Sequence, residues 1–153
     1  MSTSATATAS IEVAVDPDTA FTVFTADIGA WWKRGTPYWN DAEHGQELRF
    51  EPQVGGRLIE VHDQESGEGF EIGCVLVWEP GRRLVFTWRQ GDWGASETTE
   101  VEVRFEAAGQ GTRVIVEHGG WDRVPSAGPS MHTGYSHGWA ELLGYYAEKA
   151  GAR

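Results

Sequence analysis

Cysteine, basic residues and long apolar runs are all scarce in this sequence of 153 residues. Cys74 is the only cysteine, which excludes an internal disulfide and a cysteine-based zinc cluster. With 12 basic residues against 23 acidic ones, the formal net charge of −11 disfavours nucleic acid and anionic membrane surfaces as partners. No run approaches the roughly 20 apolar residues of a membrane span, and residues 1–10 lack the basic and apolar regions of a signal peptide. We therefore expect a cytoplasmic protein that binds neither nucleic acid nor membrane.

Aromatic side chains are abundant by contrast, with eight Trp, six Phe and four Tyr. Such rings fill a core or line a pocket, and their number alone does not choose between the two. We find no internal repeat and no linker-like stretch between residues 11 and 150. The sequence thus predicts a flexible N-terminus over residues 1–8 and a single domain over residues 9–150.

The N-terminal part predicts one strand and two short helices. Residues 9–15 alternate apolar and polar side chains, which is typical of a strand. Asp16 and Pro17 suit the N-cap and first turn of a helix that runs to about residue 25. A second helical turn over residues 27–32 is expected to end before Gly35.

The middle of the sequence predicts an antiparallel meander, because short apolar runs alternate with glycine-containing turns. In residues 98–107 the apolar positions alternate strictly with charged ones, so one face of the sheet is covered and the other is wet. The turn glycines provide the positive φ that tight turns require. The six predicted strands are residues 47–51, 57–62, 70–78, 83–90, 98–107 and 112–118.

One long amphipathic segment remains to cover the sheet, residues 129–150. On a helical wheel its apolar side chains share one arc. Strand, two short helices, six strands and a long helix make an α+β fold, in which a curved seven-stranded antiparallel sheet wraps around the C-terminal helix. The residues of the apolar arc are Met131, Tyr135, Trp139, Leu142, Leu143, Tyr146 and Ala150.

This order of elements, together with four short stretches, resembles the START-like (SRPBCC) superfamily, and within it the branch named after the activator of the heat-shock-protein-90 ATPase. The likeness covers residues 11 to about 150. It implies a helix-grip fold with an elongated hydrophobic cavity between helix and sheet. Members include lipid carriers, polyketide aromatases and cyclases, an enediyne self-resistance protein and co-chaperones, so the likeness implies little about activity. The stretches are residues 15–17 (VDP), 54–57 (VGGR), 78–88 (WEPGRRLVFTW) and 111–121 (GTRVIVEHGGW), the last followed by Gly138-Trp139.

The side chains that the pattern directs toward the space between helix and sheet are the candidate ligand-binding residues. Ordinary core packing is the alternative for each ring and each aliphatic side chain. For the two histidines, hydrogen bonds to backbone or water are the alternative to a polar anchor or an acid/base role. The candidates are Trp88, Val101, Val103, Val116, His118, His132, Tyr135 and Trp139.

Other features of the sequence bear on the site. His132 and His137 lie about 140° apart on a helix, so they do not converge on a metal, and we expect neither a metal nor another cofactor. Gly134 and Gly138 cost about 1 kcal/mol each against alanine, which suggests close approach to the sheet or room for a ligand, with simple tolerance as the alternative. We expect Trp31, Trp32, Trp93 and Trp121, which lie in turns or short helices, to form a lid or rim.

We therefore predict a monomeric or homodimeric protein that binds a small hydrophobic or aromatic molecule without catalysis. A polyketide aromatase or cyclase using His118, His132 or Tyr135 is the enzyme alternative. Activation of a chaperone ATPase, as in the namesake of the branch, is the alternative from the class of interaction proteins.

Overall fold

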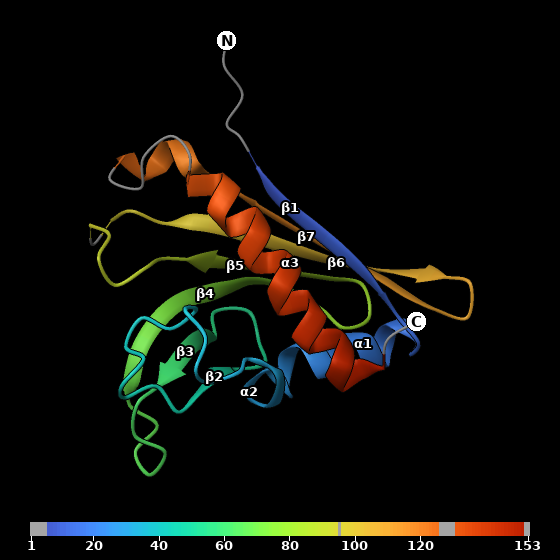
Figure 1. Ribbon diagram of the computed structural model, residues 1–153, viewed down its shortest axis with the longest axis horizontal. Helices are drawn as coiled ribbons and strands as arrows, with labels where there is room; N and C mark the ends of the chain where they lie inside the picture. The colour runs from blue at the N-terminus through green and yellow to red at the C-terminus, as the bar shows by residue number, and fades with distance from the viewer. Residues whose placement is uncertain (1–5, 95, 126–130, 152–153) are drawn as a thin grey trace.

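A computed structural model describes residues 6–94, 96–125 and 131–151 (Figure 1). Seven antiparallel strands form one sheet in the order β1-β7-β6-β5-β4-β3-β2, so the first strand pairs with the last. No helix among these residues is long and apolar enough to cross a membrane. The elements are β1 (Ala7–Val13), α1 (Pro17–Thr25), α2 (Ile28–Trp31), β2 (Glu47–Phe50), β3 (Arg57–Val61), β4 (Gly69–Glu79), β5 (Arg83–Trp88), β6 (Thr99–Ala108), β7 (Gly111–Gly119), the 3₁₀ helix η1 (Trp121–Arg123) and α3 (Met131–Ala150).

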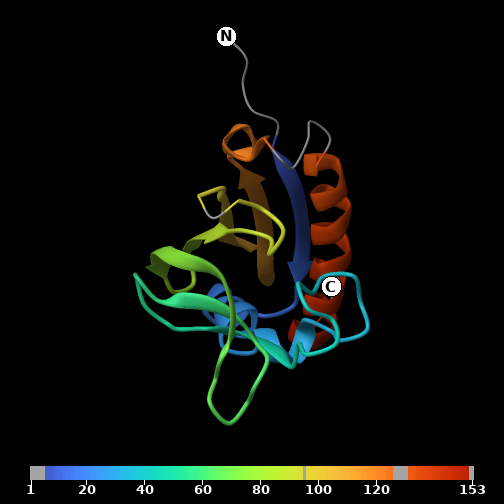
Figure 2. The same ribbon diagram turned by 90° about the vertical axis from the view of Figure 1, so that its left-hand side faces the viewer.

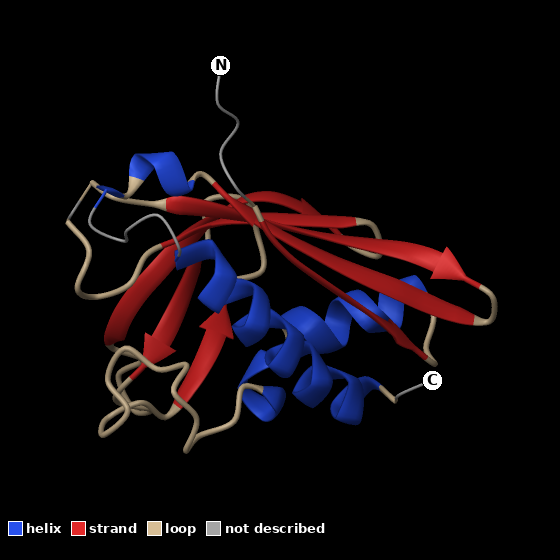
Figure 3. Cartoon of the chain, turned by 45° about the horizontal axis from the view of Figure 1, so that its top comes forward, coloured by secondary structure: helices blue, strands red, loops and turns tan. Residues whose placement is uncertain are grey.

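The predicted α+β architecture is confirmed. The strands form a curled sheet, and α1, α2 and α3 gather on its concave side (Figure 3). The long helix α3 lies along β1, as two views of the chain show (Figures 1 and 2). Burial along β6 alternates residue by residue, as the predicted wet and covered faces require. Within the described residues, both short helices and all seven strands lie where the sequence predicted them.

Element boundaries shift by a few residues where tertiary pairing overrides the local pattern. β1 begins at Ala7 rather than residue 9, because Ala7 pairs with His118 at the far end of β7. β5 ends at Trp88 rather than residue 90, where its pairing with Thr99 of β6 stops. The first two residues of the predicted long helix, Pro129 and Ser130, lie outside the described residues.

The turn chemistry follows the prediction. Gly55, Gly67, Gly81 and Gly109 all adopt positive φ, each in a turn between consecutive strands. Asp16 occupies the N-cap position of α1, but its carboxylate accepts a hydrogen bond from the Thr19 hydroxyl rather than from a backbone N–H.

The core below the middle of α3 is built from aromatic rings. Phe24 of α1 lies 5.2 Å from Trp31, 5.4 Å from Tyr146 and 5.9 Å from Phe105, measured between ring centroids. The Tyr146 hydroxyl donates a 2.8 Å hydrogen bond to the carbonyl of Ala20. These contacts tie α1, α2 and the C-terminal half of α3 to the sheet and fill the space between them.

Candidate functional site

A pocket of about 220 Å³ opens beside the N-terminal half of α3. Its floor comes from α3, its opposite wall from residues 37–40 in the segment after α2, and its inner end from the end of β5. It does not run the length of the helix, because the aromatic core occupies the space farther along. The lining residues are Trp32, Pro37, Tyr38, Trp39, Asn40, Trp88, Gln90, Met131, Gly134, Tyr135, Gly138, Trp139 and Leu142.

Three tryptophans form the inner wall of this pocket, one from β5, one from α3 and one from the position directly after α2. Trp88 lies 5.9 Å from Trp139 and 6.1 Å from Trp32, and Trp32 lies 6.1 Å from Trp139. All three are at least nine-tenths buried, so their positions are fixed by packing. This wall presents flat apolar surfaces at several angles, which suits a compact aromatic guest.

Gly134 and Gly138 lie on the side of α3 that faces the pocket. A Cβ at Gly138 would lie 3.2 Å from the Tyr38 ring, whereas a Cβ at Gly134 would meet nothing within 4 Å. The first glycine is therefore explained by close approach of Tyr38, and the second leaves space open. The close neighbour of Gly138 is therefore Tyr38, in the segment after α2, and not the sheet as the sequence suggested, while room for a ligand at Gly134 stays a prediction.

His118 lies behind the tryptophan wall and has no exposed surface. Trp139 Nε1 donates to its Nδ1 at 3.1 Å, and its Nε2 lies 2.6 Å from the Thr99 hydroxyl. Since an indole N–H can only donate, Nδ1 is the acceptor and Nε2 carries the proton. Burial lowers the pKa of His118 to about 3, so the ring is neutral at physiological pH. Neither ring nitrogen is free to exchange a proton with a molecule in the pocket.

A second chain of hydrogen bonds links the pocket wall itself. Trp88 Nε1 donates to the Tyr135 hydroxyl at 2.9 Å, and that hydroxyl donates to Gln90 Oε1 at 2.5 Å. Gln90 Nε2 in turn donates to Asp92 at 3.2 Å. Burial raises the pKa of Tyr135, so it keeps its proton at all pH values at which the protein is handled.

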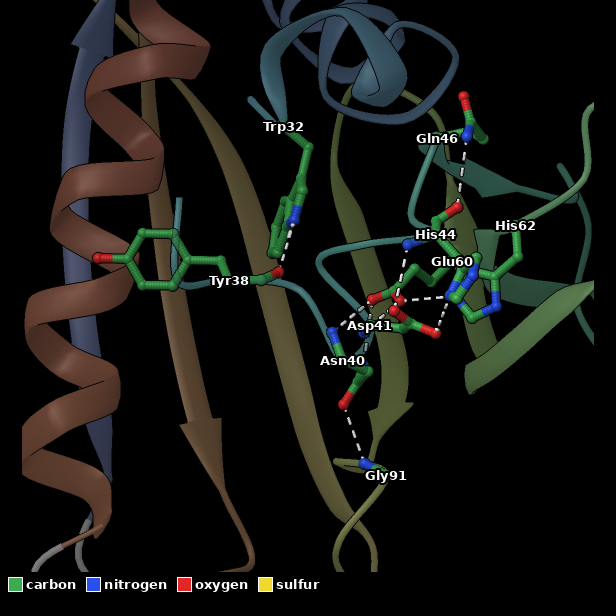
Figure 4. A network of polar contacts seen from close by, with 9 residues as sticks. All are labelled: Trp32, Tyr38, Asn40, Asp41, His44, Gln46, Glu60, His62 and Gly91. Atoms are coloured by element: carbon green, nitrogen blue, oxygen red, sulfur yellow. Dashed lines mark hydrogen bonds and ion pairs between the residues drawn. The ribbon is translucent and has the colours of Figure 1, made fainter. Parts of the chain in front are cut away.

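Buried Glu60 on β3 anchors the segment that forms the outer wall of the pocket (Figure 4). Its carboxylate accepts hydrogen bonds from the backbone N–H of Asn40 at 2.7 Å and of Asp41 at 2.9 Å. His62 Nε2 lies 2.7 Å from the same carboxylate. The Asn40 side chain accepts from the Gly91 N–H at 2.9 Å and so connects this segment to the loop after β5. These polar contacts hold the outer wall in addition to the packing of Tyr38 and Trp39 against the core.

Three of the eight candidate residues, Trp88, Tyr135 and Trp139, line the pocket. The other five do not. His118 lies behind the wall, and His132 is half-buried at the start of α3 outside the lining. The remaining three are fully buried on the sheet beneath the helix: Val101, Val103 and Val116.

The expected lid or rim of tryptophans is wrong for three of its four members. Trp31, Trp93 and Trp121 are buried: Trp31 packs on Phe24, and Trp93 and Trp121 pack on each other. Trp32 alone of the four lines the pocket.

Sequence reasoning missed the outer wall altogether. Residues 37–40 carry no periodic pattern, and the sequence predicted Gln90 as the last residue of a strand. The run Pro37-Tyr38-Trp39-Asn40, with its two adjacent aromatics in a segment outside any helix or strand, was the signal available.

No group of three or more histidine, cysteine or acidic side chains that could hold a metal ion occurs within the described ranges. Asp41, His44, Glu60 and His62 form hydrogen-bonded pairs instead, 2.8 Å for Asp41 with His44 and 2.7 Å for Glu60 with His62. The pKa of Asp41 is lowered and that of His44 raised by their mutual hydrogen bond.

A curled seven-stranded antiparallel sheet around a long C-terminal helix, with two short helices after the first strand, defines the helix-grip class of START-like proteins. Residues 14–146 match the model of the family described as "Activator of Hsp90 ATPase homolog 1-like protein". The chain belongs to this family, as its sequence motifs predicted. A comparison with curated proteins gives no significant match.

Solved structures share the fold along nearly the whole chain. Txn09, an anthrahydroquino-gamma-pyrone synthase solved with a bound molecule, is 28% identical with a TM-score of 0.59, covering 94% of this chain and 95% of its own. The Aha1 dimer from Colwellia psychrerythraea is 17% identical with a TM-score of 0.67, covering 95% and 96%. CalU16 from Micromonospora echinospora is 19% identical with a TM-score of 0.64, covering 95% and 74%.

Proposed function

We propose that the protein binds a small hydrophobic or aromatic molecule in the pocket beside α3 and does not transform it. The observation that carries this proposal is the pocket of about 220 Å³ with its wall of three tryptophans. An apolar cavity of about 150 Å³ holds benzene, so this pocket has room for one or two fused rings. The mostly apolar lining, with a few polar groups at one end, is typical of ligand sites.

The hydrogen bonds of His118 and Tyr135 support binding over catalysis. Both ring nitrogens of His118 are engaged, and Tyr135 already donates its proton to Gln90. General acid/base catalysis requires a group within hydrogen-bond reach of substrate with a pKa near the working pH. Neither of these two side chains meets that requirement.

Enzyme activity of the aromatase or cyclase kind is the second candidate, and the identity with Txn09 is the observation that favours it. It predicts turnover of a polyketide-type substrate that is lost in His132→Ala without loss of stability. Activation of a chaperone ATPase, which the family description suggests, predicts stimulated ATP hydrolysis when the protein is added to the chaperone.

A pair of glycine substitutions in α3 tests the binding proposal. Naphthalene is added to the protein, and tryptophan fluorescence and the melting temperature are recorded. We expect quenching and thermal stabilisation of the parent, because a ligand that binds only the folded state stabilises it. Gly138→Leu should abolish both effects by occupying the pocket.

Gly144→Leu is the matched control, since Gly144 lies in the same helix, outside the pocket, with nothing within 4 Å of its added Cβ. Both variants gain similar helix propensity, which raises the melting temperature. In Gly138→Leu the new side chain also presses on the Tyr38 ring, and that strain lowers the melting temperature of this variant relative to Gly144→Leu. An equal response of the parent and Gly138→Leu would show that naphthalene binds outside this pocket. No response of the parent to any apolar ring compound would end the proposal.

We propose a monomer or homodimer as the oligomeric state, since the structure from Colwellia psychrerythraea is described as a dimer. Light scattering coupled to size-exclusion chromatography separates the two.

A further inference from the structure

The hydrogen bonds of the pocket wall form one directed chain in which every proton can be assigned. Asp92 can only accept, so the Gln90 amide turns its nitrogen to Asp92 and its oxygen to Tyr135. Trp88 Nε1 can only donate, so the Tyr135 oxygen accepts from it. The Tyr135 hydroxyl therefore donates its hydrogen bond to Gln90 Oε1.

The Tyr135 hydroxyl oxygen can accept one further hydrogen bond. A phenol has one proton and two acceptor positions. The proton is held by Gln90 and one acceptor position by Trp88, which leaves the second acceptor position. All three side chains line the pocket, and Tyr135 is at the polar end of an otherwise aromatic wall.

The charges around the pocket disfavour a ligand that carries a carboxylate. Among the described residues that line it there is no lysine, arginine or histidine. The amide nitrogens of Gln90 and Asn40 already face the carboxylates of Asp92 and Glu60. A ligand carboxylate would lose its hydration, find no cation and meet these two negative charges, which is costly in a mostly apolar site.

From these contacts we infer that Tyr135 is a specificity-determining residue that accepts a hydrogen bond from the ligand. The pocket then selects uncharged aromatic molecules that carry an O–H or N–H group. It discriminates against the corresponding ethers, which have no proton to donate, and against carboxylates. The inference rests on the proposed function and adds the chemical class of the ligand to it.

Four naphthalene compounds of similar shape test the inference: naphthalene, 2-naphthol, 2-methoxynaphthalene and 2-naphthoate. Dissociation constants are measured at pH 7 by tryptophan fluorescence and calorimetry. We expect 2-naphthol to bind about twofold to tenfold more tightly than its methyl ether, the range for one hydrogen bond between uncharged groups. We expect 2-naphthoate to bind more weakly than naphthalene itself.

Tyr135→Phe should bring the ratio of the naphthol and ether dissociation constants toward one. The substitution removes the acceptor and frees Trp88 Nε1, which can then donate to an ether oxygen. Tyr145→Phe on the same helix is the control, because Tyr145 bonds Glu141 outside the pocket and its loss should leave the ratio unchanged.

The outcomes separate the two proposals. Binding of naphthalene without preference for the naphthol, or a preference that persists in Tyr135→Phe, overturns the inference and leaves the proposed function standing. Tight binding of 2-naphthoate also overturns it. If none of the four compounds binds, the proposed function fails, and the inference fails with it. The ligand series on the parent protein decides the matter even if Tyr135→Phe does not fold.

Discussion

Replacing Glu60 with glutamine tests whether a buried carboxylate holds the outer wall of the pocket. The Glu60 side chain is 1% exposed, and its two oxygens accept from two backbone N–H groups and face one imidazole nitrogen. Glutamine has the same shape but only one acceptor oxygen. If that oxygen keeps the N–H of Asn40, the new NH₂ group faces the N–H of Asp41, donor against donor, and the His62 ring has to take the tautomer in which Nε2 accepts.

The magnitude follows from these contacts. Two hydrogen bonds to a charged group are lost, at about 1.5–3 kcal/mol each, and the cheaper burial of a neutral amide offsets part of that loss. We expect the free energy of unfolding to fall by about 3 kcal/mol. For a chain of this size that corresponds to a melting temperature lower by about 6–12 °C.

Urea denaturation measures the change in free energy of unfolding, and amide hydrogen exchange shows where it arises. The N–H groups of Asn40 and Asp41 should lose protection, and the affinity for aromatic ligands should fall with it, because residues 37–40 line the pocket. Glu71→Gln on the neighbouring strand, where the carboxylate is exposed, should change stability by less than about 0.5 kcal/mol. A loss below about 1 kcal/mol at Glu60, or exchange rates at Asn40 and Asp41 equal to those of the parent, would refute the reasoning.

Two further predictions concern the core. The unfolded protein binds a proton at His118 below its ordinary pKa of 6.5, whereas the native protein does so only near pH 3. The contribution of His118 to the free energy of unfolding is therefore present at pH 7 and is lost as the pH falls. The loss amounts to about 2 kcal/mol between pH 7 and 5. Urea titrations should show a smaller acid-induced decline in His118→Leu, and equal declines would contradict the buried neutral ring. Tyr146→Phe removes the buried hydrogen bond to Ala20 and should cost about 1 kcal/mol in thermal denaturation. Tyr145→Phe removes only an exposed hydrogen bond to Glu141 and should be near neutral, and equal effects would show that the buried bond contributes nothing.

The strands and helices could be predicted because their patterns are local. The alternation along β6, the turn glycines with positive φ and the apolar arc of α3 each depend on residues close together in the sequence. The four short stretches together added the family. The pairing of the first strand with the last was not predicted and comes from the structure. Boundaries shifted by one or two residues, for example where pairing with another strand set the start of β1 and the end of β5.

The pocket could be predicted only in part. Trp88, Tyr135 and Trp139 follow from strand and helix periodicity. Parity along a strand gives the face on which Val101, Val103, Val116 and His118 lie, but it does not give the distance of that face from a cavity. The aromatic rings of α1, α2 and α3 occupy the space above much of the sheet, and that filling depends on side-chain volumes meeting from distant segments.

The sequence by itself determined the order of elements, the covered face of the sheet and the aromatic character of its core, since these depend on periodicity and composition. Only the tertiary structure decided where the pocket lies and which side chains line it. Residues 37–40 become a wall because Glu60, twenty residues from Asn40, binds their backbone. The direction of the hydrogen bond at Tyr135 was likewise decided by Trp88 and Gln90, more than forty residues earlier in the chain, because a proton's position depends on its partners in space.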